Sequence, residues 1–528
     1  MSNPSIMFYH DGRHPLIYMY EPPMQKAEYE AAVDELVGTS VEALMFCMGD
    51  GRTVLHDTQV GELWGDNVDK WDHIIFRRAH QNAKALIDSG NDPLKIVCER
   101  AHAKGMKVYP TLLMAQKTGN RENDNRGSDW RFNNTHLEIG AASDIDESFA
   151  GYRNLDFKHK EVRDERIALM KETFEKYDID GFEMQLNYMP VYFHPNEVKD
   201  GISIMNDFVG EVYNLLKSSG KNRELAIRVP GSVTGSLSIG LDVATWINEG
   251  TADVIIGQTY GNPELIDPMA DFTDFVNLAK GKDCRIHAAL QSHLDSDRLS
   301  EAPIEMIRAT ASNYWRQGID GLYLAHWFNN WPYEASFYEK LREVAHPDIM
   351  ETKDKFYSIA TSTGRYTEPD LEPGLEMQLP VEMEEGSTAN LEMDISDDLE
   401  LWDKTDRVHQ VILRIRIEAT TELDEYEFIL NGNKLSEKEL RKLNRMYVMS
   451  APRYRRTGYW YVFTLGKDNW PAKGKNQITI NMKKRDDGVI PLPKVLDVEL
   501  EIKYLMGKNY HRDYVDAELG PYESKADQ

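Results

Sequence analysis

The stretch YDIDGFEMQLNYMP, residues 177–190, contains polar residues at a spacing that suits chemistry on one face of a β-strand. Strand alternation places Glu183, Gln185 and Asn187 on one face and the apolar residues between them on the other. A buried carboxylate costs free energy unless it has a partner or a chemical task. Glu183 is therefore a candidate general acid or base, and the alternative is a structural carboxylate that is satisfied by an arginine.

Polar residues also follow the other predicted strands, and all of them are expected at the carboxyl edge of one sheet. In chain order they are Asp50, Arg52, Gln116, Lys117, Arg228, Gln258, Tyr260, Gln291, His293, His326, Trp327, Asn329 and Asn330. Amides and imidazoles hydrogen-bond sugar hydroxyls, and aromatic rings stack on flat sugar faces. The candidate stacking residues are Trp64, Trp327, Trp331, Tyr188 and Tyr192. This mixture favours a concave site for an oligosaccharide.

Short apolar runs alternate with amphipathic stretches through the first 350 residues, which is typical of repeated βα units. The predicted strands are Leu16–Tyr20, Ala43–Met48, Lys107–Leu113, Gly181–Leu186, Leu225–Val229, Val254–Thr259, Arg285–Leu290 and Leu322–Ala325. Gly105, Gly220, Gly281 and Gly318 follow predicted helices, where glycine accepts the left-handed conformation without strain. No GxGxxG or P-loop follows a strand. The pattern predicts an α/β fold, a (β/α)8 TIM barrel with its active site at the carboxyl ends of the strands.

Beyond Pro347 the periodicity changes to the alternation of strands, which predicts a smaller all-β sandwich. The expected strands are Leu375–Pro380, Ala389–Ile395, Val408–Ile417, Tyr426–Leu430, Gly458–Leu465, Gln477–Met482 and Val495–Tyr504. Asn431-Gly432 is a tight-turn signal between strands, and Ser436–Asn444 is predicted as a helical insertion. The chain is therefore divided into a catalytic barrel, residues 1–350, and a C-terminal β-sandwich, residues 351–528.

The composition argues against several classes of binding partner. The 528 residues include 61 Lys+Arg and 88 Asp+Glu, a formal net charge of −27 with no basic run, which argues against nucleic acid. Cys47, Cys98 and Cys284 lie far apart and are expected to be buried thiols, and no cofactor or metal is predicted. No apolar run approaches the roughly 18 residues of a membrane span. The N-terminal sequence as written predicts a cytoplasmic protein, or a periplasmic or secreted one if a leader has been removed.

The run NLDFKHKEVRDERIALMKETFEKYDIDGFEMQLNY, residues 154–188, resembles the glycoside-hydrolase-like (β/α)8 barrels found in many uncharacterised bacterial proteins. In that family an Asn-Leu-Asp segment precedes a long helix and then a strand of the type D-G-I-E-L-D-F. The segments RIRIEA, EYEFILNGNKL, GKNQITI and VLDVELEIKY resemble the β-sandwich often appended to those barrels. The resemblance implies glycan processing. This chain departs from the pattern at Gln185, where the family strand has a second carboxylate.

Three functions are compatible with these residues, and the leading one is a glycoside hydrolase that acts on oligosaccharides from a polysaccharide. Hydrolysis normally uses two carboxylates. Glu183 is one, and the candidates for the second are Asp50, Glu21, Asp156 and Asp295, of which Asp50 is carried forward as a catalytic residue. The residues expected to orient sugar hydroxyls are Gln185, Asn187, Gln258, Gln291, His293, His326, Trp327 and Asn330.

The first alternative is a dehydratase or lyase that acts on a uronate-containing glycan. In that reaction Tyr260, His293 or His326 would serve as base or acid, and Arg228 or Arg52 would neutralise the uronate. The second alternative is a carbohydrate-binding protein without catalysis. The sandwich is expected to brace the barrel or to form a homo-oligomer interface.

Overall fold

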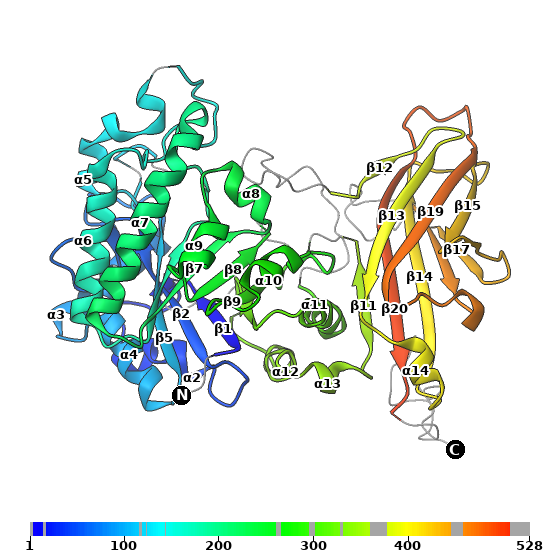
Figure 1. Ribbon diagram of the computed structural model, residues 1–528, viewed down its shortest axis with the longest axis horizontal. Coiled ribbons are helices and arrows are strands. Elements are labelled where there is room, and N and C mark those ends of the chain that lie inside the picture. Colours follow the sequence, from blue (N-terminus) through cyan, green and yellow to red (C-terminus); the bar gives the residue numbers. More distant parts are fainter. Residues whose placement is uncertain are drawn as a thin grey trace.

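The computed structural model describes residues 4–13, 17–115, 119–122, 124–142, 144–259, 266–294, 301–327, 331–359, 377–444 and 458–506. The chain forms two parts, a barrel that runs from blue to green in Figure 1 and a β-sandwich that runs from yellow to red beside it. None of the helices within these ranges has the length and apolarity that crossing a membrane requires.

Eight parallel strands close into the barrel. They are β1 Ile6–His10, β2 Ala43–Asp50, β5 Lys107–Leu113, β6 Gly181–Gln185, β7 Glu224–Pro230, β8 Val254–Gln258, β9 Arg285–Leu290 and β10 Gly321–Leu324. The sheet closes because β1 pairs with both β2 and β10. Two short strands, β3 Thr53–Val54 and β4 Glu62–Leu63, extend the sheet beyond β2. The predicted (β/α)8 barrel is confirmed.

Helices surround the barrel strands. They are α1 Lys26–Tyr29, α2 Ala31–Asp34, α3 Ile74–Asp88, α4 Pro93–Ala103, α5 Asp129–Asn133, α6 Lys160–Lys176, α7 Val198–Ser219, α8 Val233–Ser238, α9 Val243–Glu249, α10 Thr273–Ala279, α11 Ile304–Arg316, α12 Ala335–Glu343 and α13 Pro347–Met350. Gly105, Gly281 and Gly318 adopt positive φ angles of 76°, 76° and 87°, as predicted. Gly220 instead has an extended backbone with φ −177°, so α7 ends without a left-handed residue.

The first barrel strand differs from the prediction. It is Ile6–His10, whereas Leu16–Tyr20 was expected, and residues 18–20 form a turn and a bend. All five residues of β1 are buried, whereas Met19 in the turn is 53% exposed. A strand with both faces buried reads as a continuous apolar run, so alternation does not separate two apolar segments that lie this close together. The error moves the end of the first strand by ten residues, which matters for the site.

The sandwich consists of two antiparallel sheets. One contains β11 Lys355–Ser358, β12 Val381–Glu382, β14 Val408–Glu418, β17 Leu440–Asn444, β18 Tyr459–Thr464 and β20 Lys494–Tyr504. The other contains β13 Thr388–Ile395, β15 Glu425–Leu430, β16 Asn433–Lys434 and β19 Gly474–Lys484. The helix α14 Leu399–Asp403 joins β13 to β14. Inward-facing side chains of both sheets form one apolar core. The predicted all-β domain is confirmed.

Two local predictions within the sandwich have opposite outcomes. Asn431 and Gly432 both have positive φ, 51° and 82°, and form the two-residue turn between β15 and β16. The predicted helical insertion Ser436–Asn444 is wrong, because Leu440–Asn444 is the edge strand β17 and pairs with β18. Cross-strand pairing overrides the local helix preference there. In the predicted strand Leu375–Pro380, the first two residues lie outside the described ranges.

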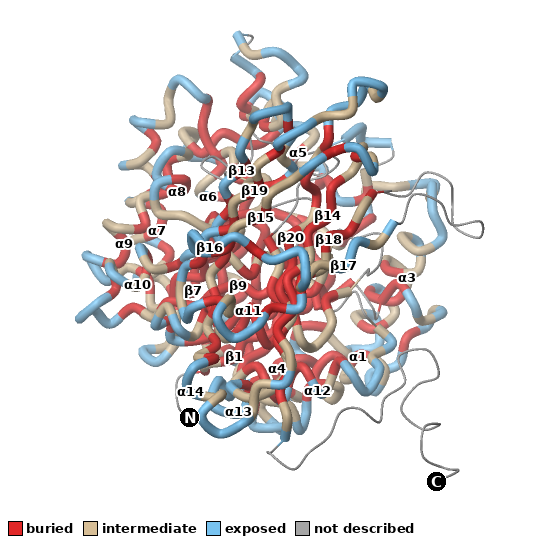
Figure 2. Tube along the Cα trace, turned by 90° about the vertical axis from the view of Figure 1, so that its right-hand side faces the viewer, coloured by how far each residue is buried: buried red, intermediate tan, exposed pale blue. Residues whose placement is uncertain are grey.

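Helix α11 of the barrel packs against the sandwich. Its Ala309 belongs to the apolar core of the sandwich, and Asn313 donates hydrogen bonds to the carbonyls of Pro268 and Asp394, at 2.9 and 2.8 Å. Figure 2 shows the buried residues concentrated in the centre of the molecule, beneath exposed connections. The sandwich is thus attached to a helix on the outside of the barrel, and the barrel interior contains its own polar groups.

Candidate active site

Alternate residues of each barrel strand face the interior, and β6 contributes Glu183 and Gln185. Strand register places Glu183 beside Thr111 of β5 and Ala226 of β7, two residues before the carboxyl end of β6. Its side chain is 0% exposed. Glu183 therefore lies inside the barrel, one layer below the mouth, by which we mean the carboxyl ends of the barrel strands.

Both carboxylate oxygens of Glu183 accept hydrogen bonds. Arg228 Nε donates to Oε1 at 2.7 Å, and the Tyr323 hydroxyl donates to Oε2 at 2.9 Å. Arg228 Nη1 also donates to Gln258 Oε1 at 3.1 Å. Burial raises the pKa of Glu183 above its ordinary value, although Arg228 and Tyr323 act in the opposite direction. The arginine partner that the structural alternative required is thus present, together with the raised pKa that suits a general acid.

The guanidinium of Arg228 lies between two aromatic rings. The distances from its central carbon to the ring centroids of Tyr9 and Tyr323 are 4.5 and 4.6 Å. Rings on both sides stabilise the cation through their negative faces. Arg228 is 0% exposed, so its contact with Glu183 lies inside the barrel.

Buried polar atoms at the mouth have no partner among the described residues. They are Oε1 of Gln185, both amide atoms of Asn187 and Oε1 of Gln291, and the hydroxyl of Thr111, one layer deeper beside Glu183, also has none. Each such atom costs about 1–3 kcal/mol if nothing satisfies it. Strands β5, β6 and β9 bring these atoms to the same end of the barrel. They are the groups that a bound polar ligand would satisfy.

The two predicted residues at the end of β2 face different neighbours. The carboxylate of Asp50 is 2.9 Å from Arg13 Nη1 and 3.7 Å from Arg126 Nε. The side chain of Arg52 instead forms ion pairs with Glu62 and Glu165, at 3.5 and 3.9 Å. Asp50 thus belongs to a charged group at the rim of the barrel, and Arg52 belongs to a neighbouring cluster.

The predicted histidines are partly buried. His293 Nδ1 is 3.4 Å from the Ser292 hydroxyl. His326 has a φ angle of 53°, and its ring centroid is 5.6 Å from that of Tyr9. The His326 ring therefore lies close to the tyrosine that covers Arg228. The following candidates lie outside the described residues: Gln116, Lys117, Tyr260, Asp295, Asn329 and Asn330.

Three of the predicted stacking residues are core residues. Trp327 and Trp64 are 0% exposed, and Tyr192 is 1% exposed. The Trp327 indole donates to the Leu290 carbonyl at 2.9 Å, and the Tyr192 hydroxyl donates to the Leu186 carbonyl at 2.7 Å. Their rings pack against other side chains, so the prediction that they stack on sugar is corrected. Trp331 and Tyr188 remain partly exposed.

The remaining predicted acids are placed elsewhere. Glu21 extends its exposed side chain toward Arg78, and Asp156 is paired with Lys158 at 3.2 Å.

The three cysteines are free and buried, as predicted. Across the described ranges, no group of three or more His, Cys, Asp or Glu side chains is arranged to hold a metal ion.

Sequence reasoning missed four residues around the mouth: Tyr9, Asp11, Arg13 and Tyr323. Tyr9 lies on β1, and Asp11 and Arg13 follow this strand directly. Placing the first strand at Leu16–Tyr20 removed all three from the predicted edge. A usable signal was the repeated tripeptide Asp-Gly-Arg, at residues 11–13 and 50–52.

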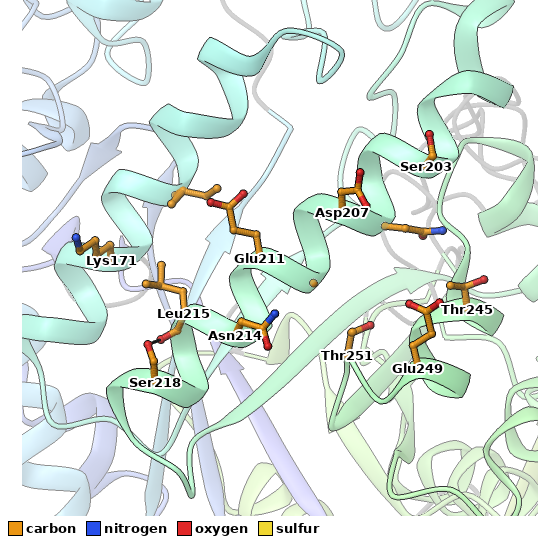
Figure 3. Close-up of a pocket in the computed structure, with 13 residues that line it drawn as sticks. Lys171, Ser203, Asp207, Glu211, Asn214, Leu215, Ser218, Thr245, Glu249 and Thr251 are labelled. Atoms are coloured by element: carbon orange, nitrogen blue, oxygen red, sulfur yellow. Dashed lines mark hydrogen bonds between the residues drawn. The ribbon is translucent and has the colours of Figure 1, made fainter.

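A large depression of about 1000 Å³ lies away from the mouth, on the outside of the barrel. Figure 3 shows its lining on α6, α7 and the region of α9, with Lys171 and Glu249 on opposite sides and Glu211 between them. Its side chains come from outer helices and not from strand ends. It is therefore separate from the candidate active site.

No protein-family model matches the chain, and neither does any curated protein. Solved structures that are similar to it include alpha-L-fucosidase isoenzyme 2 from Paenibacillus thiaminolyticus, at 11% identity, 66% of this chain, 50% of that chain and a TM-score of 0.43. The PgaB (BpsB) glycoside hydrolase domain from Bordetella bronchiseptica matches at 12% identity, 65% of this chain, 98% of that chain and a TM-score of 0.39. An alpha-amylase from Lactobacillus plantarum matches at 9% identity, 90% of this chain, 98% of that chain and a TM-score of 0.37.

The match spans half of the fucosidase's own length, and all three likenesses concern the fold. The strand pairing of this chain itself confirms a (β/α)8 barrel with an appended all-β domain. The activity has to be argued from the residues at the mouth, because one barrel fold hosts many chemistries.

Proposed function

We propose that this chain is a carbohydrate-active enzyme of the glycoside hydrolase class, which cleaves an oligosaccharide at the mouth of its barrel. The supporting observation is that Gln185, Asn187 and Gln291 bring buried amide atoms to the strand ends, where the described protein supplies no partner for them. Sugar hydroxyls both donate and accept hydrogen bonds, so an oligosaccharide satisfies such atoms. An apolar ligand would leave them unpaired at a cost in free energy.

Hydrolysis requires a group that gives a proton and a group that takes one. We assign Glu183 as the acid, because burial raises its pKa, and Asp50 as the base at the rim. Asp50 takes a proton from water as the water oxygen bonds to the anomeric carbon. The glycosidic carbon–oxygen bond breaks, and its oxygen takes the proton of Glu183. Proton exchange with water then restores both groups.

The arginines favour hydrolysis over elimination. Elimination at a uronate needs a cation or amide donors beside the substrate carboxylate. Arg228 is buried against Glu183 and Gln258, and Arg52 is paired with Glu62 and Glu165. Both arginines that were predicted for that role are already bonded to acidic or amide side chains of the protein.

The test is product analysis of the full chain on a panel of neutral and uronate-containing oligosaccharides. New reducing ends are expected with at least one glycan, and Asp50→Asn is expected to lower the rate by roughly 10²–10⁴-fold. Asp34→Asn is the matched control, because Asp34 is also bound by an arginine, Arg100 at 2.6 Å, but lies on the outer helix α2.

Absence of new reducing ends on every glycan, or an undiminished rate in folded Asp50→Asn, would overturn the proposal. A new ultraviolet absorbance from a conjugated double bond, or loss of one water without chain cleavage, would identify the elimination reaction instead. Saturable binding of a glycan without any product would identify a carbohydrate-binding protein.

A further inference from the structure

Two neighbouring strands end in the same tripeptide, Asp-Gly-Arg. Residues 11–13 follow β1, and residues 50–52 cover the end of β2. Gly12 and Gly51 have positive φ angles of 76° and 58°, so each turn uses a conformation that glycine accepts without strain. Because β1 and β2 are parallel neighbours, both turns lie at the mouth of the barrel.

In the first turn one guanidinium binds two carboxylates. Arg13 Nε and Nη2 lie 3.1 and 3.2 Å from the two oxygens of Asp11, and Arg13 Nη1 lies 2.9 Å from Asp50 Oδ2. The backbone N–H of Arg13 also donates to Asp11 at 2.9 Å. The planar fork of arginine suits this arrangement, because separate edges of one rigid group bond to separate carboxylates.

The second turn does not repeat this geometry. Arg52 turns toward Glu62 and Glu165, so it does not bind the aspartate of its own tripeptide. Asp50 is held by the arginine of the neighbouring strand instead. A second cation, Arg126, lies 3.7 Å from the same oxygen, but its side chain is 45% exposed. The closest charged contact of Asp50 in the described structure therefore comes from Arg13.

The group is nearly buried without being closed off. Asp11, Arg13 and Asp50 are 8%, 5% and 6% exposed. Burial alone would lower the pKa of Arg13, but Asp11 and Asp50 raise it well above its ordinary value, so the side chain is a cation. The group therefore contains one nearly buried cation between two carboxylates, and the more exposed Arg126 is a second cation 3.7 Å from Asp50.

Strand register connects this group to the amide atoms of the mouth. Asp50 pairs with Leu113 of β5, and Leu113 pairs with Gln185 of β6. Gln185 Oε1 is one of the buried atoms that have no partner among the described residues. Asp50 therefore lies at the same level of the barrel as this amide oxygen.

We infer that Arg13 is a positioning residue that holds the catalytic carboxylate of Asp50 at the substrate, and that Asp11 in turn holds Arg13. This inference rests on the proposed function, because it assigns residues to the same reaction. Asp11 binds two nitrogens of the guanidinium and so limits its rotation, which leaves Nη1 directed at Asp50. A displacement of about 1 Å in a reacting group can cost about 10²-fold in rate.

The test is a double-mutant cycle on a glycan that the wild-type chain cleaves, with kcat and KM measured separately. Arg13→Gln and Asp11→Asn are expected to lower kcat by about 10²-fold and 10-fold while KM stays nearly constant. In an Asp50→Asn background, Arg13→Gln is expected to have no further effect. Arg100→Gln, which removes the guanidinium from Asp34 on the barrel's exterior, should cleave at the wild-type rate.

Equal losses from Arg13→Gln in both backgrounds would overturn the inference, because the arginine would then act independently of Asp50. Undiminished kcat in a folded Arg13→Gln variant would overturn it as well. If Arg13→Gln does not fold, Asp11→Asn in the two backgrounds decides the same question. Failure of the wild-type chain to cleave any glycan is a different result, since it overturns the proposed function and removes the reaction that the inference requires.

Discussion

The barrel mouth and the β-sandwich both contain buried polar groups, but their hydrogen bonding differs. In the sandwich, Lys355 Nζ lies 2.9 Å from Asp397 Oδ1 and also donates to two backbone carbonyls. The hydroxyls of Tyr357 and Tyr504 donate to the same carboxylate. Asn476 likewise uses its amide oxygen and nitrogen fully, with four bonds of 2.7–2.8 Å.

Asn187 at the mouth is the counterpart of Asn476. Both side chains are at most 1% exposed, yet neither amide atom of Asn187 has a partner in the described structure. Buried polar groups in folded proteins normally have hydrogen-bond partners. The fully bonded network of the sandwich is therefore typical of groups that stabilise the fold, and the unbonded amide atoms at the mouth are typical of groups that bind a ligand. Burial alone thus does not separate structural from functional polar residues, and Asn476 and Asn187 differ instead in how completely their amides are hydrogen-bonded.

The largest effect is expected from Glu183→Gln. We expect kcat/KM for glycan cleavage to fall by roughly 10²–10⁴-fold, because the amide has no proton to give to the leaving oxygen. Steady-state rates measured beside Asp397→Asn provide the comparison, since that sandwich variant weakens a buried pair far from the mouth and its folded fraction should cleave normally. An unchanged rate in Glu183→Gln would make Glu183 a structural carboxylate like Asp397.

A large loss of stability is expected from Asp397→Ala. Lys355 would keep its charge in a buried position without its carboxylate, which costs about 3–5 kcal/mol in the free energy of unfolding. Urea unfolding monitored by circular dichroism measures the loss. Asp403→Ala is the control, because Asp403 pairs with the exposed Lys467 and surface pairs contribute about 0–1 kcal/mol. Equal losses from the two variants would mean that the sandwich cluster is not a stabilising network.

The two buried asparagines offer a matched pair of leucine variants. Asn476→Leu removes four hydrogen bonds and leaves their partners unpaired, so it should lower the free energy of unfolding by about 3 kcal/mol or more. Asn187→Leu should leave the free energy of unfolding unchanged or raise it, while oligosaccharide affinity falls about tenfold. Denaturation and calorimetric titration measure the two quantities. Similar destabilisation by both variants would contradict the assignment of Asn187 to a ligand.

The smallest effect concerns the pH dependence of stability. Burial raises the pKa of Glu183 above its ordinary value of 4.5, so the folded state binds this proton more tightly than the unfolded state. The corresponding stability is fully present below pH 4.5 and is lost as the pH rises through the folded pKa. Urea unfolding of wild type and Glu183→Gln across this range should give a difference that changes with pH. Parallel stability curves would show that Glu183 has the same proton affinity in both states.

Much of the fold could be predicted because periodicity depends on local sequence. The runs around Lys107–Leu113 and Arg285–Leu290 match the strands of the structure, and Gly105, Gly281 and Gly318 follow helices as expected. The first strand could not be separated from the nearby apolar segment at Leu16–Tyr20, because a strand buried on both faces lacks alternation. Because of that error Asp11 and Arg13 were not predicted as site residues, since a residue was considered only where a predicted strand ends.

The amino-acid sequence by itself determined that this protein is an α/β barrel followed by a β-sandwich, and that amides and carboxylates gather at the strand ends. Only the tertiary structure decided which polar groups have partners. Glu183 meets Arg228 across 45 positions of the chain and Tyr323 across 140. Barrel closure sets these distances, whereas hydrophobic periodicity reports only which face of a strand a residue occupies.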